Sequence, residues 1–233
     1  MNWIKRFFGA SESPEISSAL PELPTEVTTP AALRARYGGL YRPAVHLRPC
    51  ADESFSRLGG LPSMPTDFEW PIWNDRPQSF LAQIDLAEVH RSMPSCLPEA
   101  GYLYFFYDQE QGIWGFDPKD LGGWRVLYSP VAQSKLVEHP APEGLPDECI
   151  FKAKPVRPHL IELLPDSQSL PKVDFEWRRD GEVYSQLRLQ AFEGTHCHQM
   201  LGYPSPVQND KMEEECQLAS NGVYIGNADC GAV

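Results

Sequence analysis

The sequence lacks the local patterns that mark common catalytic, nucleotide-binding and metal-binding sites. It contains no GxxxxGK[ST] or GxGxxG phosphate loop, no GxSxG turn, no HExxH and no EF-hand loop. Its six cysteines form no CxxC pair, so neither a zinc ribbon nor a redox dithiol is expected. No apolar run approaches the roughly 20 residues of a membrane helix, and the N-terminal MNWIKRFFG has no signal-peptide core. We therefore expect a cytoplasmic protein with reduced thiols, no membrane span and no resident cofactor or metal.

Positive charge is also scarce. Lys and Arg number 20 against 32 Asp and Glu, which gives a formal net charge of −12 at pH 7. A field of this sign repels nucleic acids and anionic membranes and attracts basic proteins. The acidic excess falls in three blocks, residues 52–90, 97–149 and 200–233. These blocks predict a basic protein partner and no nucleic acid.

The composition is that of a folded globular chain. Hydrophobic residues make up 42% of the 233 positions, and the chain is long enough to bury a core without disulfides. The 23 prolines argue against a long helical bundle, because each removes a backbone donor. Residues 1–29 are predicted to be a leader and linker, and residues 30–233 a single domain with possible repeated halves at 30–130 and 160–233.

Strand patterns dominate the first half of that domain. SFLAQID (79–85) and GYLYFFY (101–107) are predicted strands, with 113–116 as the hairpin partner of the second and 124–128 as a third strand. The proline-rich stretch 129–159 is predicted to be a surface excursion or the join between the halves.

Helix signals are shorter. Thr29-Pro30 caps a predicted helix that ends at Tyr37, and Asp85 caps a predicted turn over 86–91. Two further helices are predicted at 182–192 and 211–219. The string LGGLP (58–62) resembles LGYP (201–204), which indicates an internal duplication.

Two groups of polar residues are candidates for a ligand or metal site. Gln83 and Asp85 share one face of an apolar strand, so they bond to backbone and cap a helix, or they line a pocket with Asp85 as a general base. His196 and His198 flank Cys197 at strand spacing and could share a metal ion, or they could simply end a polar strand. For both groups the structural role is favoured over the functional one.

Several separated strings resemble one family. LGGLPSMP (58–65), FLAQIDLAEV (80–89), LPEAGYLYFFYD (97–108), HQMLGYPSPVQ (198–208) and ECQLASNG (215–222) are similar, in this order, to the YwqG-like family of bacterial proteins. The resemblance implies a β-rich α+β fold of antiparallel sheets with a few short helices and internal pseudo-repetition. It brings no reaction and no catalytic residue, and it associates some relatives with immunity to bacterial toxins. The resemblance also implies further strands after the SNG string, whereas the given sequence stops soon afterwards, at Val233. We therefore expect an open sheet edge that a partner strand completes.

These observations favour a non-enzymatic protein-binding module, specifically an immunity protein that occludes the active site of a basic bacterial toxin such as a nuclease. Acidic side chains would set the association rate and aromatic side chains would anchor the interface. The alternative is a small-molecule-binding protein or hydrolase with a pocket around Gln83 and Asp85. The expected partner-binding residues are Asp108, Glu110, Trp114, Asp117, Asp120, Glu213, Glu214 and Glu215.

Overall fold

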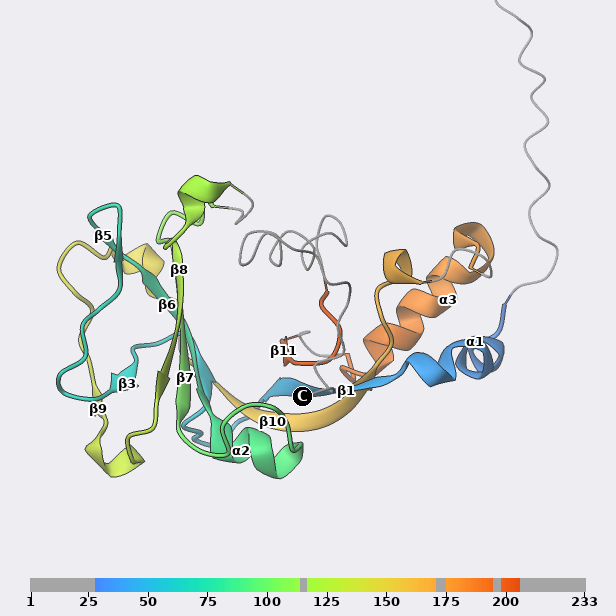
Figure 1. The fold of residues 1–233 in the computed structure, drawn as a ribbon, viewed down its shortest axis with the longest axis horizontal. Helices are drawn as coiled ribbons and strands as arrows, with labels where there is room; N and C mark the ends of the chain where they lie inside the picture. Colours follow the sequence, from blue (N-terminus) through green and yellow to red (C-terminus); the bar gives the residue numbers. More distant parts are fainter. Residues whose placement is uncertain (1–27, 114–116, 171–174, 195–197, 206–233) are drawn as a thin grey trace, which may run out of the picture.

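A strongly curled antiparallel sheet forms the centre of the molecule (Figure 1). The computed structural model describes residues 28–113, 117–170, 175–194 and 198–205. In spatial order the sheet contains β11 (Gln199–Met200), β1 (Arg42–Pro49), β10 (Lys154–Leu163), β2 (Arg57–Leu58), β6 (Ser79–Asp85), β7 (Tyr102–Tyr107) and β8 (Trp124–Ser129). Two smaller pairs lie beside it, β3 (Ser63–Met64) with β9 (Val137–Glu138) and β4 (Ile72–Trp73) with β5 (Arg76–Pro77). The α+β, β-rich fold expected from the sequence is confirmed.

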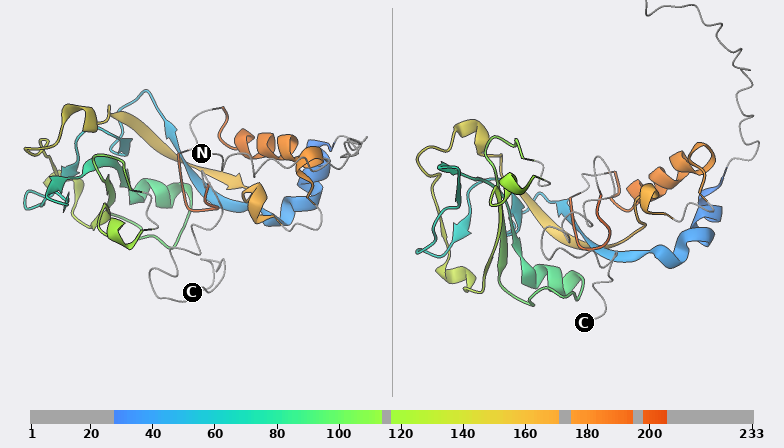
Figure 2. Two further views of the ribbon diagram at one scale, coloured as in Figure 1. Left: turned by 90° about the horizontal axis from the view of Figure 1, so that it is seen from above. Right: turned by 45° about the horizontal axis from the view of Figure 1, so that its top comes forward.

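Among the described residues, three α-helices and several single 3₁₀ turns accompany the sheet. α1 (Pro30–Tyr37) and α3 (Trp177–Gln190) pack together at one end of the β1–β10 ribbon, and α2 (Leu86–Ser92) lies against β10 (Figures 1 and 2). The 3₁₀ turns are η2 (Gly38–Leu40), η3 (Pro118–Asp120), η4 (Gln133–Lys135), η5 (Asp147–Cys149) and η6 (Ser167–Ser169). No helix within the described ranges is both long and apolar enough to cross a membrane.

Local chemistry explains the helix starts. The Thr29 hydroxyl accepts a hydrogen bond from the Ala32 amide at 3.2 Å, as its position before Pro30 predicts. Asp85 caps α2 in the same way and accepts from the Ala87 amide at 2.8 Å. Both predicted caps are confirmed.

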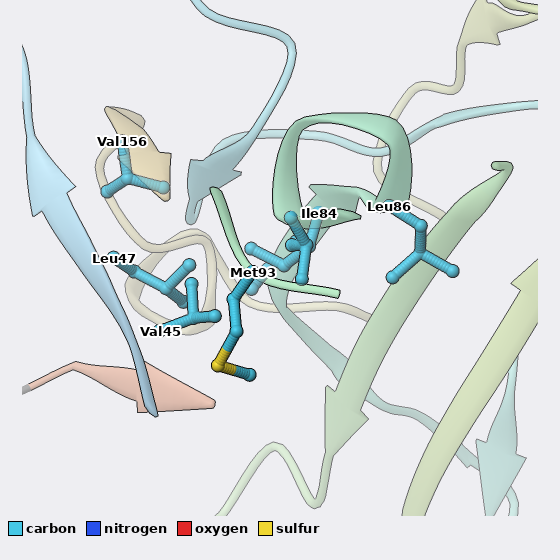
Figure 3. Packing of buried hydrophobic residues seen from close by; sticks show 8 residues of the cluster. Val45, Leu47, Ile84, Leu86, Met93 and Val156 are labelled. Atoms are coloured by element: carbon cyan, nitrogen blue, oxygen red, sulfur yellow. The ribbon is translucent and has the colours of Figure 1, made fainter. Parts of the chain in front are cut away.

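The main core lies between β1, β6, β10 and α2. Val45 and Leu47 of β1 meet Ile84 of β6 and Val156 of β10, while Met93 closes the cluster just after α2 (Figure 3). A second core on the other face of β7 contains Tyr104 and Phe106, and a third joins α1 to α3. Successive side chains of β7 point alternately into the main core and into this second core, because strand side chains alternate between the two faces of a sheet.

Four strands are arranged with approximate two-fold symmetry about the β1–β10 pair. β11 flanks β1 through the pair Val45 and Met200, and β2 flanks β10 through the pair Lys154 and Leu58. If residues 45–49 are treated as equivalent to 154–158, and residues 57–58 to 199–200, the β1–β11 pairing matches the β10–β2 pairing residue for residue. The β1–β10 register obeys the same symmetry, with Arg48 opposite Arg157 at its centre.

The sequence carries a trace of this symmetry. Leu47-Arg48-Pro49 corresponds to Val156-Arg157-Pro158, and Leu47 and Val156 meet in the main core. After each short outer strand, two successive residues adopt positive φ: Gly59 (64°) and Gly60 (75°), then Leu201 (62°) and Gly202 (67°). The structural equivalence thus aligns Gly60-Leu61-Pro62 with Gly202-Tyr203-Pro204, one residue away from the LGG–LGY match read in the sequence.

The structure corrects three sequence-based assignments. Ile113 is not in a strand, and the partner of β7 is β8, which pairs Tyr107 with Trp124 across a long connection. The third helix begins at Trp177 and runs through Asp180-Gly181, so it starts before the predicted boundary at residue 182. A Cβ at position 181 would lie 2.8 Å from the Trp177 indole, so glycine lets that ring fold over the helix. The predicted helix at 211–219 lies outside the described residues.

Strand β10 is the third correction, since its prolines had indicated a loop. Pro155 and Pro158 both lie within it, although β10 is central in the sheet. The Val156 amide donates to the Ser56 carbonyl at 3.0 Å, so the nitrogen of Pro158 faces the same side two residues further on. Within β10, only Lys154 and Pro155 pair with β2, so the missing donor of Pro158 falls beyond the end of that short strand.

Candidate functional site

The connection between β7 and β8 is built on Asp108. This side chain is 3% exposed and accepts hydrogen bonds from the amides of Glu110 (3.3 Å) and Gly112 (3.1 Å). The Asp108 amide donates to the Gly123 carbonyl at 2.7 Å, which closes the base of the connection. Asp108 therefore shapes the loop by a short-range carboxylate turn and does not present its charge to solvent.

The far end of the connection is fixed to the β4–β5 region by two side chains. The buried amide of Gln78 donates to the Gly122 carbonyl at 2.9 Å, and the indole of Trp73 donates to the Leu121 carbonyl at 3.2 Å. Gly122 has a φ of 94°, which suits glycine, and an added Cβ would lie 3.2 Å from the Trp73 ring. These contacts hold the connection against the hairpin, so Leu121 projects from a supported backbone.

The β4–β5 hairpin is a tight turn through Asn74 and Asp75. Both residues have positive φ, 50° and 59°, the conformation of a type I′ turn that Asn and Asp tolerate. Arg76 of this hairpin pairs with Glu110 of the connection and lies 4.0 Å from an oxygen of Asp108. The hairpin and the connection are thus joined by charge as well as by the Trp73 bond.

Apolar and acidic side chains meet on the outside of this assembly. Leu121 in the connection is 78% exposed, and Ile72, the neighbour of the partly buried Trp73 in β4, is 63% exposed. We call the region the hairpin surface, and it consists of Ile72, Trp73, Asp75, Glu110, Asp117, Asp120 and Leu121. Isolated exposed apolar residues are ordinary, but two beside a half-buried Trp with an acidic rim resemble an interface centre.

The acidic members of the hairpin surface differ in their local roles. Asp117 accepts from the Lys119 amide at 2.9 Å and caps the 3₁₀ turn η3 that carries Asp120. Glu110 is 61% exposed at its side chain beside Arg76. Burial raises the pKa of Tyr107, and the nearby charges of Asp108 and Asp120 raise it further. Asp108 and Asp120 therefore both lie close enough to Tyr107 to act on its hydroxyl.

The wider charge distribution reinforces this local picture. Residues 52–149, which run from before β2 to the end of η5, contain 16 acidic and 6 basic residues, a net −10. Two of the three acidic blocks thus lie in the same part of the fold (Figure 1). The acidic residues of the third block, among them Glu213, Glu214 and Glu215, lie outside the described residues, as does Trp114.

Sequence reasoning named Glu110, Asp117 and Asp120 of this surface but neither Asp75 nor its apolar centre. Asp108 is used within the loop, while Glu110, Asp117 and Asp120 lie on the hairpin surface. Trp73 and Leu121 were missed because they are 48 positions apart and neither sits in a recognisable motif. The Asn74-Asp75 pair between short apolar segments was the signal that could have indicated the hairpin.

Gln83 and Asp85 have structural partners. The Gln83 side chain is fully buried, accepts from the Ser63 amide at 2.9 Å and donates to the Phe55 carbonyl at 2.8 Å. Asp85 caps α2, and its amide donates to the Ser56 hydroxyl at 3.0 Å. The two residues accordingly fill the roles that the sequence favoured for them, backbone bonding and helix capping.

A large apolar cavity lies on the opposite face of β6. Its volume is about 870 Å³, and it is lined by the neighbours of Gln83 in the strand, Ala82 and Ile84, and by Phe105 of β7. Because strand side chains alternate, Gln83 and Asp85 point away from this cavity. The space that a ligand could occupy is therefore separate from the pocket suggested by sequence.

The histidine candidate is only partly described. His196 and Cys197 lie outside the described residues, and the carbonyl of His198 accepts from the Leu47 amide at 2.8 Å, beside the short strand β11. Within the parts of the chain that the structure describes, no three His, Cys, Asp or Glu side chains are grouped closely enough to hold a metal ion.

Comparison with known families assigns most of this fold to one group. A family model described as "Domain of unknown function (DUF1963)" matches residues 56–229, which is more than half of the chain. The chain belongs to this family. The DUF1963 match begins just before β2 and includes β11, so it spans both short outer strands of the two-fold arrangement and the whole β7–β8 connection. α1 and β1 precede it. No curated protein matches the chain.

Proposed function

We propose that this chain is a non-enzymatic protein-binding module and that the hairpin surface is its binding site. The observation that carries the proposal is the exposure of Leu121, whose carbonyl accepts the Trp73 hydrogen bond, together with the exposure of Ile72 beside Trp73 in β4 and the carboxylates of the same hairpin and connection. Interfaces take most of their energy from a few apolar and aromatic anchors, while charges at the rim steer association.

The partner that suits this surface is a basic protein. Glu110, Asp117 and Asp120 lie at the rim, and the surrounding residues 52–149 carry a net −10. Complementary fields of this kind raise association rates by about 10–10³-fold and weaken with salt. Leu121 and Ile72 would then enter apolar pockets of the partner once the charges have oriented it.

The resemblance to the YwqG-like family supports a narrower proposal, that the partner is a secreted bacterial toxin domain and the chain its immunity protein. Blocking a basic active site requires a preformed acidic surface, and the four ties of the β7–β8 connection (Asp108, Gln78, Trp73 and Arg76) supply that rigidity. A pre-ordered surface loses less conformational entropy on binding.

The proposal is tested by capture with matched variants. The full chain, Leu121→Asp and Leu189→Asp are used as baits in native cells, since Leu189 is also exposed (56%) but lies on α3. We expect one basic protein to bind wild type and Leu189→Asp at low salt and to be lost with Leu121→Asp. If no protein distinguishes the two variants, the hairpin surface is not the binding site.

Kinetics with the purified partner then test the role of charge. Asp117→Lys should slow association several-fold and reduce its salt dependence, whereas Glu182→Lys on α3 changes the net charge equally and should have little effect. Equal effects of both variants would assign the slowing to net charge alone and remove the rim from the proposal.

Growth measurements test the narrower proposal. Expression of the captured partner in a bacterial host should arrest growth, and co-expression of wild type should restore it, whereas Leu121→Asp should not. If the partner binds through Leu121 but does not arrest growth, the protein-binding proposal stands and the immunity proposal is rejected.

A further inference from the structure

The apolar cavity beside β6 is a second site, distinct from the hairpin surface. It lies on the concave side of the curled sheet and extends from the main core. β1, β2, β6, β7, β8 and β11 and the start of β10 all contribute to its wall. The residues that the argument uses are Leu58, Phe105, Val126, Lys152, Lys154 and Met200. Its volume of about 870 Å³ falls within the range of small-molecule pockets, roughly 300–1,000 Å³.

The two-fold arrangement places equivalent strands at this cavity. Leu58 of β2 and Met200 of β11 correspond to each other, and both line it. Between them the wall is formed by aliphatic and aromatic side chains, so the cavity offers a continuous apolar surface. Val126 on β8 is 55% exposed and marks the open side.

The charged residues at the cavity do not follow the two-fold arrangement of the strands. Lys152 and Lys154 line the cavity beside Leu58, and neither Asp nor Glu is found among its described lining residues. Neither lysine forms an ion pair with a described residue, although this chain has a net charge of −12. Two cations at an apolar cavity complement a ligand with an apolar body and an anionic head.

We propose that this cavity binds a fatty acid as its carboxylate, with the head group at Lys152 and Lys154 and the tail along Phe105 toward Val126. β10 and β8 are separated by β2, β6 and β7, which makes four inter-strand steps, or roughly 19 Å at about 4.8 Å each. One acyl chain spans about half of a bilayer core that is roughly 30 Å thick. The tail therefore fits across the sheet.

Titration calorimetry of the full chain with dodecanoate, below its micelle concentration, tests this site. We expect one bound ligand per chain and a dissociation constant that falls about threefold to fourfold for each methylene added between decanoate and tetradecanoate. Dodecanol and dodecyltrimethylammonium have the same tail, and they should bind several-fold more weakly because they lack the anionic head.

Paired variants separate the head-group site from a general charge effect. Lys152→Gln/Lys154→Gln should weaken dodecanoate binding by about 2- to 10-fold without changing dodecanol binding. Lys119→Gln/Lys135→Gln removes the same charge outside the cavity and should leave both ligands unaffected. Val126→Asp should abolish binding, while Val137→Asp, also exposed but outside the cavity, should not.

Four outcomes overturn the proposal. Equal affinities for dodecyltrimethylammonium and dodecanoate would show that the site does not recognise a carboxylate. The same conclusion would follow if the two lysine double variants bound dodecanoate equally well. Val126→Asp that binds as wild type does would reject the cavity. No binding of any of the three ligands would mean that another occupant, such as residues 206–233 of this chain, fills the space. None of these results bears on the proposed protein partner, which binds at the hairpin surface.

Discussion

Trp73 donates its indole N–H to the carbonyl oxygen of Leu121 at 3.2 Å, and this bond joins the β4–β5 hairpin to the β7–β8 connection. The two residues have different roles in the hairpin surface, since Trp73 is partly buried and Leu121 is 78% exposed. One hydrogen bond thus ties the backbone of the exposed Leu121 to the partly buried Trp73.

Trp73→Phe removes that donor and keeps most of the ring. We expect the free energy of unfolding in urea to fall by about 0.5–1.5 kcal/mol, because the Leu121 carbonyl loses its partner. Trp177→Phe is the matched control, since Trp177 is 63% exposed and should change stability by less than about 0.5 kcal/mol. Equal effects of the two changes would show that the Trp73 bond contributes nothing.

Asp85 variants separate a helix cap from a general base. Asp85→Ala should cost about 1 kcal/mol of unfolding free energy because the Ala87 amide loses its acceptor, whereas Asp85→Asn should cost only a few tenths. Both values come from urea denaturation monitored by circular dichroism. A general base would instead lose its function in Asp85→Asn, so unimpaired partner and ligand binding in that variant agrees with the cap.

Asp180 should make stability depend on acid pH. Its buried carboxylate is held by Arg179 at 2.8 and 2.9 Å and bonds to Thr28 and the Glu176 amide, which together keep its pKa well below the usual range. A lowered folded-state pKa contributes stability above the unfolded pKa of about 3.9, and that contribution is lost as pH falls below it.

Asp180→Asn should therefore be less stable than wild type by about 2–3 kcal/mol at pH 7, and the difference should shrink below about pH 4. Urea unfolding at several pH values measures it. Asp52→Asn, at an exposed pair with Arg157, should change stability by less than about 1 kcal/mol at every pH. A constant difference between wild type and Asp180→Asn across pH would contradict the assignment.

Gly59 should tolerate no side chain. Its φ is 64°, and an added Cβ would lie 2.7 Å from the Lys152 carbonyl oxygen, so Gly59→Ala should cost at least about 2 kcal/mol. Gly39 has open space around it, and Gly39→Ala should be close to neutral. Thermal unfolding of both variants provides the comparison; a Gly59→Ala protein as stable as Gly39→Ala would refute the close approach.

The sequence predicted elements whose signals are local. Thr29-Pro30 and Asp85 give helix starts because capping depends on the next three residues, and the aromatic alternation of 102–107 gives a strand. β10 escaped prediction because its prolines suggested a loop, and β1 was not predicted at all. Pro158 is tolerated only because β2 is short, and no local pattern records the length of a neighbouring strand.

The candidate site was predictable only in part, for a similar reason. Asp117 and Glu110 were found because charge is visible residue by residue. The partnership of Trp73 with Leu121 and the cavity on the face opposite Gln83 depend on which strands become neighbours. Such neighbours are set by long-range pairing, and composition carries no trace of it.

The central pairing of β1 with β10 has a consequence for synthesis of the chain. His46 pairs with His159, so β1 leaves the ribosome more than a hundred residues before its partner. At about 5–20 residues per second, it waits unpaired for roughly 5–20 seconds. The β6–β7–β8 meander is complete by residue 129 and can fold during that interval. Chains truncated before residue 154 and released from the ribosome should therefore carry a folded meander beside a β1 segment that chaperones can still bind.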